Sequence, residues 1–291
     1  MIGTDVVLQV ILSGLLTGCV YALIAIGFTL VFGVTEIVNF AHGHLVMVAM
    51  FAGYVLFRFA GMDPFVSLLV VLPAFFLLGM ALYWLVIDRI VEAPHFAHMM
   101  VTLGVLIFLE NLMNFFFGGD LRGVTTSYTT ASLPLGGVAV PVARAAAAGT
   151  SLLAVAVLAL FLRLSRYGRA IRAAANNRMA AQLVGIDVRR VYMVSFAIGT
   201  AVVALAGVVM LPFSLVSPFV GDEFMLKAFV IAIVGGLGSV TGALAGGVLI
   251  GLVEALTGLF LVASLGNAIV FGILILVLFI RPAGLLRRAG E

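Results

Sequence analysis

Long apolar runs separated by short polar interruptions dominate the pattern of residues along this chain. The first run, from Val6 to Phe32, contains no charged residue and holds Gly14 and Gly18 at a spacing typical of helices that pack closely in a bilayer. A helix that crosses a membrane needs about 20 predominantly apolar residues. On this basis we expect helical segments near residues 6–32, 45–57, 65–87, 97–117, 145–162, 191–211, 224–237, 241–262 and 267–280.

The composition indicates a protein that is surrounded mostly by lipid. Hydrophobic residues make up 64% of the 291 residues and charged residues only 9%, whereas soluble proteins carry about 25% charged residues. We therefore expect an all-α fold, a polytopic transmembrane helical bundle of eight or nine membrane segments that forms one domain over residues 1–291. Interrupted or re-entrant helices are expected within it, and segment 224–237 is short enough either to cross or only to re-enter.

Positive charge is concentrated in one loop and at the C-terminus. Residues 163–190 hold seven of the fifteen Lys and Arg residues, the last ten residues add Arg287 and Arg288, and none precedes Arg58. Because Lys and Arg accumulate in short cytoplasmic loops, we expect the 163–190 loop and the C-terminus in the cytoplasm and the N-terminus outside. The polar stretch at about 118–144 then becomes an outward loop.

The stretch EIVNFAHGHL, which begins at Glu36, places polar side chains between two apolar runs. Glu36, Asn39, His42 and His44 would be costly in contact with lipid, so we expect them near an interface or facing a cavity within the protein. Gly43 permits a helix break, and a new helix near His44 would present unpaired N–H groups that suit an anionic group such as an amino acid's carboxylate. The same residues could instead cap helices at the cytoplasmic interface.

A second interruption precedes the segment near 241–262. Gly236, Gly238 and Ser239 form a turn that resembles the first break, and two interrupted segments in corresponding halves favour a substrate pathway between repeats. Packing alone would also explain these glycines. Glu254 and Glu110 lie within apolar segments without a basic residue nearby in sequence, which leaves an ion-coupled mechanism open.

The chain lacks the motifs of an enzyme. Its one lysine, Lys227, does not follow the Gly-rich turn of a P-loop. Ser, His and acidic residues show no spacing typical of nucleophilic catalysis, and the single cysteine, Cys19, belongs to no cluster of metal ligands. We therefore expect no catalytic residue, no metal and no cofactor in this chain.

The arginine-rich segment RYGRAIRAAANNRMAAQLVGIDVRR predicts a short helix, a turn at Gly185 and a return to the membrane. Arg169 and Arg172 fall on one helical face, whereas Ala174 and Ala175 fall on the other. A solvated cytoplasmic face explains the arginines. The run of alanines makes a flat apolar surface that suits docking into another protein's groove.

Four stretches resemble the permease subunits of branched-chain amino acid ABC transporters, of the shorter of their two permease types. These are GFTLVFGVTEIVNFAHGHLVMVAMFAGY, YGRAIRAAANNRMAAQLVGIDVRRVYMVSFAIGTAVVALAG, VGGLGSVTGALAGGVLIGLVE and VLFIRPAGLL, and they occur in the family's order. The resemblance implies that the second stretch couples the permease to an ATPase, although it lacks the Glu of the general Glu-Ala-Ala pattern. The residues so implied are Gly168, Arg169, Arg172, Ala174, Ala175, Gly185 and Ile186.

The resemblance further implies an importer of Leu, Ile or Val in a bacterial inner membrane. Two permease subunits would form the pathway, two cytoplasmic ATPase subunits would bind ATP and Mg, and a periplasmic binding protein would deliver the substrate. No nucleic acid partner is expected. A urea or short-chain amide permease of the same family, an ion-coupled secondary transporter and a membrane scaffold without a pathway remain as alternatives.

Overall fold

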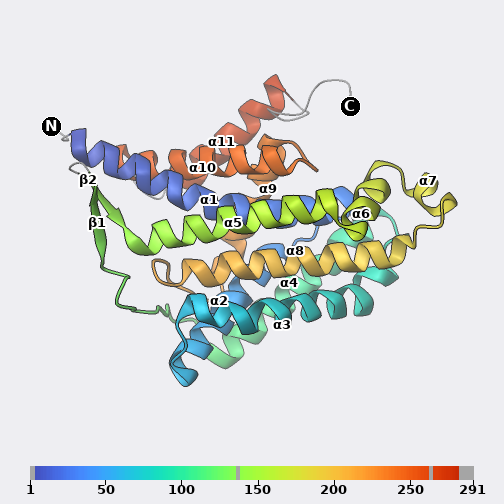
Figure 1. Ribbon diagram of the computed structural model, residues 1–291, viewed down its shortest axis with the longest axis horizontal. Coiled ribbons are helices and arrows are strands. Elements are labelled where there is room, and N and C mark those ends of the chain that lie inside the picture. The colour runs from blue at the N-terminus through green and yellow to red at the C-terminus, as the bar shows by residue number, and fades with distance from the viewer. Residues whose placement is uncertain (1–3, 136–137, 262–264, 282–291) are drawn as a thin grey trace.

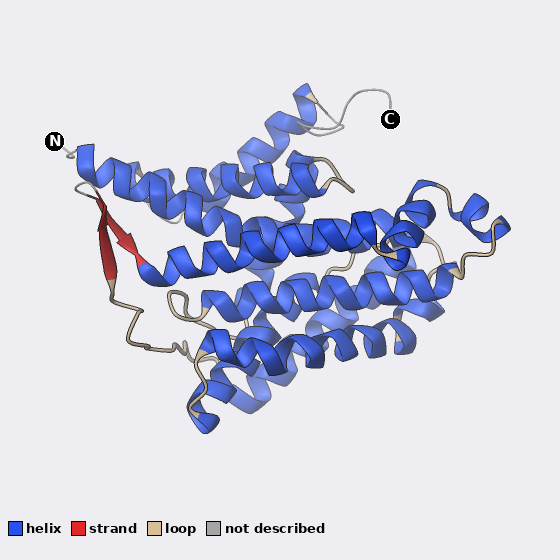
Figure 2. Cartoon of the chain, viewed as in Figure 1, coloured by secondary structure: helices blue, strands red, loops and turns tan. Residues whose placement is uncertain are grey.

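The computed structural model describes residues 4–135, 138–261 and 265–281, which form a bundle of helices with one small hairpin (Figures 1 and 2). The predicted all-α transmembrane bundle is thereby confirmed. The hairpin pairs β1 (Ser132–Leu135) with β2 (Val138–Pro141) in antiparallel fashion. The helices are α1 (Thr4–Thr35), α2 (His42–Ala60), α3 (Pro64–Leu85), the 3-10 helix η1 (Ile87–Arg89), α4 (His95–Phe117), α5 (Val142–Leu164), α6 (Arg166–Asn176), α7 (Arg178–Leu183), α8 (Val188–Met210), α9 (Val220–Gly235), α10 (Val240–Phe260) and α11 (Leu265–Ile280).

Within the described residues, seven helices are long and apolar enough to cross a membrane. They are α1, α2, α3, α4, α5, α8 and α10. The remaining two of the nine expected segments, α9 and α11, have 16 residues each. At 1.5 Å per residue each measures about 24 Å, which is less than the roughly 30 Å of a bilayer core. The structure therefore contains seven full-length segments and two short ones.

The hairpin and the arginine-rich segment lie at opposite ends of the bundle. In Figure 1 the start of α1 and both strands are at the left, whereas α6 and α7 are at the right. This arrangement fits the separation that the charge distribution predicts. The expected loop at 118–144 contains the hairpin and gives way to α5 already at Val142. Arg287 and Arg288 lie outside the described residues.

A hydrogen bond ties the 118–131 segment to the start of α3. The hydroxyl of Tyr128 donates to Oδ2 of Asp63 over 2.6 Å, while Oδ1 of Asp63 caps α3 by accepting from the N–H of Phe65. Burial, followed by this hydrogen bond, raises the pKa of the Tyr128 hydroxyl above its ordinary value. The hydroxyl therefore stays protonated, and continues to donate, throughout the physiological pH range.

Contacts between small residues hold α1 against α10. A Cβ at Gly18 would lie 2.7 Å from the Cα of Val248, and a Cβ at Gly14 would lie 2.9 Å from the carbonyl oxygen of Gly251. Lipid is as apolar as the side chains that it surrounds, so helices in a bilayer associate mainly through such close packing. The expectation that Gly14 and Gly18 are packing residues is thus confirmed.

The first helix break lies before Gly43 and not at it. α1 ends at Thr35, and Glu36 takes a left-handed backbone conformation with φ of 57°. Oδ1 of Asn39 then accepts from a backbone N–H two residues later over 3.1 Å, which closes a tight turn. α2 consequently begins at His42, two residues before the expected start near His44.

Gly43 was expected to break the helix, but in the structure it allows close packing of α2 against α9. It lies in the first turn of α2, where a Cβ would overlap the carbonyl oxygen of Gly221 and the amide nitrogen of Met225, both in α9. Across this contact, a Cβ at Gly221 would lie 2.7 Å from the imidazole ring of His44. The missing side chains allow the two helices to approach closely.

Replacing Gly43 with Ala should therefore separate α2 from α9 and destabilise the fold. Overpacking of this kind costs about 1–3 kcal/mol, so we expect a lower thermal unfolding temperature and a lower folded yield in detergent. Gly104→Ala is the matched control, because a Cβ there meets nothing within 4 Å and alanine favours a helix. Equal unfolding temperatures for the two variants would show that this approach carries no packing constraint.

Candidate functional site

Several charged residues gather around the first turns of α9. Asp222 and Glu223 are consecutive in the first turn of this helix. Asp222 approaches His44 of α2, whereas Glu223 pairs with Lys227 one turn further along α9. These two neighbours therefore belong to two separate clusters.

The first cluster, here called the His44 cluster, consists of His44, Glu110 and Asp222. Nε2 of the fully buried His44 lies 3.3 Å from Oε2 of Glu110 in α4 and 3.7 Å from Oδ1 of Asp222. The exposed fraction is 24% for the Glu110 side chain and 69% for that of Asp222. A neutral imidazole has one N–H, so Nε2 can satisfy only one of the two carboxylates.

The second cluster, here called the Lys227 cluster, is internally paired. Lys227 is only 2% exposed, and its Nζ donates to the Tyr21 hydroxyl at 3.0 Å, to Glu223 at 2.6 Å and to Glu254 at 2.8 Å. All three N–H groups of the ammonium are thus engaged. One lysine faces two carboxylates, so the cluster carries one excess negative charge. Oε2 of Glu254 is buried and has no partner among the described residues.

Four carboxylates of these two clusters are partly exposed, and together they are here called the acidic face. Glu110 lies seven residues before the end of α4, about 10 Å along the helix axis, and is therefore well within the membrane-spanning segment. Carboxylates at such a depth are costly in contact with lipid and almost always face water or other protein. The acidic face consists of Glu110, Asp222, Glu223 and Glu254.

The structure divides the residues that the sequence analysis proposed for a pathway. His44 belongs to the His44 cluster, and Glu254 belongs to the Lys227 cluster. Asn39 and His42 are buried within the chain, where Nε2 of His42 hydrogen-bonds a carbonyl oxygen of α1 at 3.0 Å. Ser239 caps α10 by accepting from a backbone N–H over 3.0 Å. Gly236 and Gly238 supply the turn before it, with φ of 96° and 87°. Asn39, Gly236, Gly238 and Ser239 therefore hold backbone turns, whereas His42 links the start of α2 to α1.

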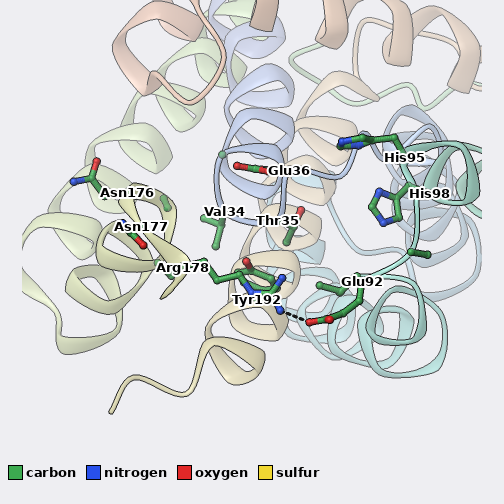
Figure 3. Close-up of a pocket in the computed structure, with 15 residues that line it drawn as sticks. Val34, Thr35, Glu36, Glu92, His95, His98, Asn176, Asn177, Arg178 and Tyr192 are labelled. Atoms are coloured by element: carbon green, nitrogen blue, oxygen red, sulfur yellow. Dashed lines mark hydrogen bonds and ion pairs between the residues drawn. The ribbon is translucent and has the colours of Figure 1, made fainter. Parts of the chain in front are cut away.

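Glu36 lies apart from the His44 cluster, in a crevice of about 520 Å³ at the α6–α7 end (Figure 3). The end of α1, residues 91–98, the α6–α7 junction and the start of α8 line this crevice. Figure 3 shows Arg178 reaching Glu92 across it, an ion pair of 2.5 Å, and the guanidinium also lies 5.8 Å from the ring centroid of Tyr192. The crevice is polar on several sides.

The arginine-rich segment folds into α6, α7 and a turn at Gly185 with φ of 84°. Gly168 allows a tight junction, since a Cβ there would overlap carbonyl oxygens at the end of α5. Arg169 and Arg172 donate back to carbonyl oxygens of that same helix end. Ile186 is half-buried. The expected helix, turn and return are thus present.

The expected docking surface of Ala174 and Ala175 is wrong in part. Ala174 is buried against this chain and only Ala175 is exposed. The reason is that the apolar side of α6 packs inward on its own bundle. The large exposed apolar residues of α7 and of the position after it are Met179 at 73%, Leu183 at 83% and Val184 at 76%, here called the α7 patch.

The sequence analysis noted Lys227 but did not recognise its role. Glu223 and Lys227 stand four residues apart in a mostly apolar helix, a spacing that places an acid and a base on one face. That signal could have identified the pair. Glu254 and Tyr21 lie 27 and 206 residues from Lys227, and only the fold brings them to it.

Removing the ammonium of Lys227 should leave two carboxylates facing each other and destabilise the fold. We expect Lys227→Met to lose about 1–3 kcal/mol, less than for a fully buried pair because Glu223 and Glu254 are partly exposed. Thermal unfolding in detergent measures the loss. The triple variant Lys227→Met, Glu223→Gln, Glu254→Gln should recover part of it, and a triple variant no more stable than the single one would contradict the pairing.

Comparison with known proteins gives consistent matches over nearly the whole chain. The model of the family described as branched-chain amino acid transport system / permease component matches residues 10–278. The high-affinity branched-chain amino acid transport system permease protein LivH of Escherichia coli K12 is 32% identical, and the match covers 97% of this chain and 96% of LivH. BraD of Pseudomonas aeruginosa, a permease protein described in the same words, is 30% identical with the same coverage. No solved structure matches the chain.

Proposed function

The chain belongs to the family of permease components of branched-chain amino acid transport systems, and we propose that it is one of two permease subunits of an ATP-driven importer for Leu, Ile or Val. The acidic face is the observation that carries this proposal. A multi-pass bundle that presents carboxylates on a partly exposed membrane-embedded surface needs water or protein against that surface.

We assign the acidic face to a pathway that this chain forms together with a second permease subunit. α9 supports this assignment, because it is too short to cross the bilayer alone. Discontinuous or short helices with polar ends are typical of substrate sites in transporters. In this arrangement the breaks at Glu36 and at Gly236 shape the helices around the pathway.

We assign the α7 patch to docking of the ATPase subunits. The chain has no P-loop, so ATP and Mg would bind to two separate cytoplasmic subunits. Met179, Leu183 and Val184 form an apolar surface on a helix that projects from one end of the bundle (Figure 1), as a helix that enters a partner's groove does. The arginines of the same segment favour the cytoplasmic side of a bacterial inner membrane for this end.

The opposite end would then face a periplasmic binding protein. The hairpin and the segment tied down by Tyr128 lie at that end, and they would receive the protein that delivers the amino acid. The chain thus combines an entrance, an acidic pathway wall and a docking helix along one axis.

Reconstitution tests the proposed function against an ion-coupled secondary transporter. Liposomes that contain this chain with its second permease, ATPase and binding-protein partners should take up leucine only when ATP is present, and uptake should survive collapse of the proton gradient. Excess urea should not compete. Leucine uptake by this chain alone, driven by a proton gradient, would overturn the proposal.

A charge in the α7 patch should uncouple ATP hydrolysis from uptake. Leu183→Asp places a carboxylate in the expected apolar contact, where its desolvation is unfavourable, so we expect leucine uptake to fall at least about tenfold. Gln182→Asp is the control, since Gln182 is an exposed polar neighbour outside the patch. Uptake and ATPase activity measured on the same liposomes decide the outcome, and equal uptake by both variants would refute the docking role.

A further inference from the structure

The two clusters beside α9 differ in how well their carboxylates are satisfied. In the Lys227 cluster a primary ammonium is held by two carboxylates and a hydroxyl at 2.6–3.0 Å. The His44 cluster presents two carboxylates and an imidazole, but no ammonium. The Lys227 cluster is therefore an example, within the same molecule, of carboxylates beside α9 that hold a primary ammonium.

Among the described residues, the His44 cluster offers one N–H group to two carboxylates. With a neutral imidazole the cluster carries two negative charges, and Nε2 hydrogen-bonds Glu110 at 3.3 Å while Asp222 remains at 3.7 Å. His44 cannot turn away, because it is fully buried and its ring lies against Gly221. The imidazole is thus fixed with Nε2 directed at both carboxylates, and Nδ1 has no partner among the described residues.

We infer that the His44 cluster is the subsite for the α-ammonium group of the transported amino acid, an inference that rests on the proposed function. Nε2 of His44, Oε2 of Glu110 and Oδ1 of Asp222 all lie within 4.8 Å of one another. Three acceptors so spaced can each lie about 2.8 Å from one nitrogen, the length of a charge-assisted N–H···O bond. A neutral imidazole carries its proton on either nitrogen. With the proton on Nδ1, Nε2 accepts the third ammonium hydrogen, and the ammonium replaces Nε2–H as the donor to Glu110.

Access to the subsite comes from the side of Asp222. Its side chain is 69% exposed, whereas His44 closes the inner end of the cluster. An ammonium would arrive from the acidic face, meet Asp222 first and then reach Glu110 and His44. Its single positive charge would offset half of the negative charge of the cluster, which makes the subsite selective for substrates that carry an ammonium group.

Binding to the assembled transporter, purified in detergent without its binding protein, tests this assignment. The probes are leucine, 3-methylbutylamine, which lacks the carboxylate, and 4-methylpentanoate, which lacks the ammonium. Leucine and the amine should raise the thermal unfolding temperature of the wild-type complex, and 4-methylpentanoate should not. Asp222→Asn should weaken binding of both ammonium compounds at least about tenfold, through the loss of one charge-assisted hydrogen bond.

Asp5→Asn is the matched control, because Asp5 is an exposed carboxylate in the first turn of α1 and should leave binding unchanged. Glu110→Gln gives a second variant if Asp222→Asn fails to assemble. Unchanged binding of leucine and the amine by a variant of the cluster, or stabilisation by 4-methylpentanoate alone, would overturn the assignment. Carboxylate and imidazole groups also bind divalent metal ions. One equivalent of such an ion that co-purifies with the wild type and is lost in Asp222→Asn would therefore also overturn the assignment.

Leucine uptake by the wild-type liposomes separates the two levels of the proposal. If the wild type imports leucine but the cluster variants bind it normally, only the subsite is refuted. If the wild type imports no leucine, the proposed function fails and the subsite fails with it.

Discussion

The close backbone approach of α2 and α9 at Gly43 and Gly221 is the contact on which the charged part of this protein depends. Lipid gives apolar helices little reason to associate, so the geometry of a membrane bundle is set by how near two backbones can come. Here the absence of two side chains brings the buried ring of His44 to the first turn of α9. One additional methyl group at Gly43 would move the imidazole away from Asp222.

The two charged clusters beside α9 differ in their contacts. On one side Lys227 binds its carboxylates internally and joins α9 to α1 and α10. On the other side, within the part of the chain that the structure describes, Asp222 and Glu110 share the single nitrogen Nε2 of His44. An ammonium that is held by two carboxylates and a hydroxyl joins helices, so the Lys227 cluster serves the structure, whereas the inferred subsite at the His44 cluster is open to solvent at Asp222.

Local pattern predicted the helices well, because a membrane span is a property of consecutive residues. Apolar runs predicted all nine apolar segments, and the arginines predicted the exposed segment that forms α6 and α7. Contacts between distant residues were beyond such reasoning: His44 and Glu110 stand 66 positions apart, and Lys227 and Glu254 stand 27 apart. Ala174 shows the same limit on a smaller scale, since helical periodicity identifies an apolar face but not whether that face turns inward or outward.

Two ion pairs at the α6–α7 end join α7 and α8 to the segment between α3 and α4. Arg178 holds Glu92, three residues before α4 begins at His95, and Arg189 at the start of α8 holds Asp88 in η1. α4 is a continuous helix that carries Glu110 toward its far end. Through Arg178 and Glu92, the α6–α7 segment is therefore joined by an ion pair to the chain that leads into α4, the helix that contributes Glu110 to the His44 cluster.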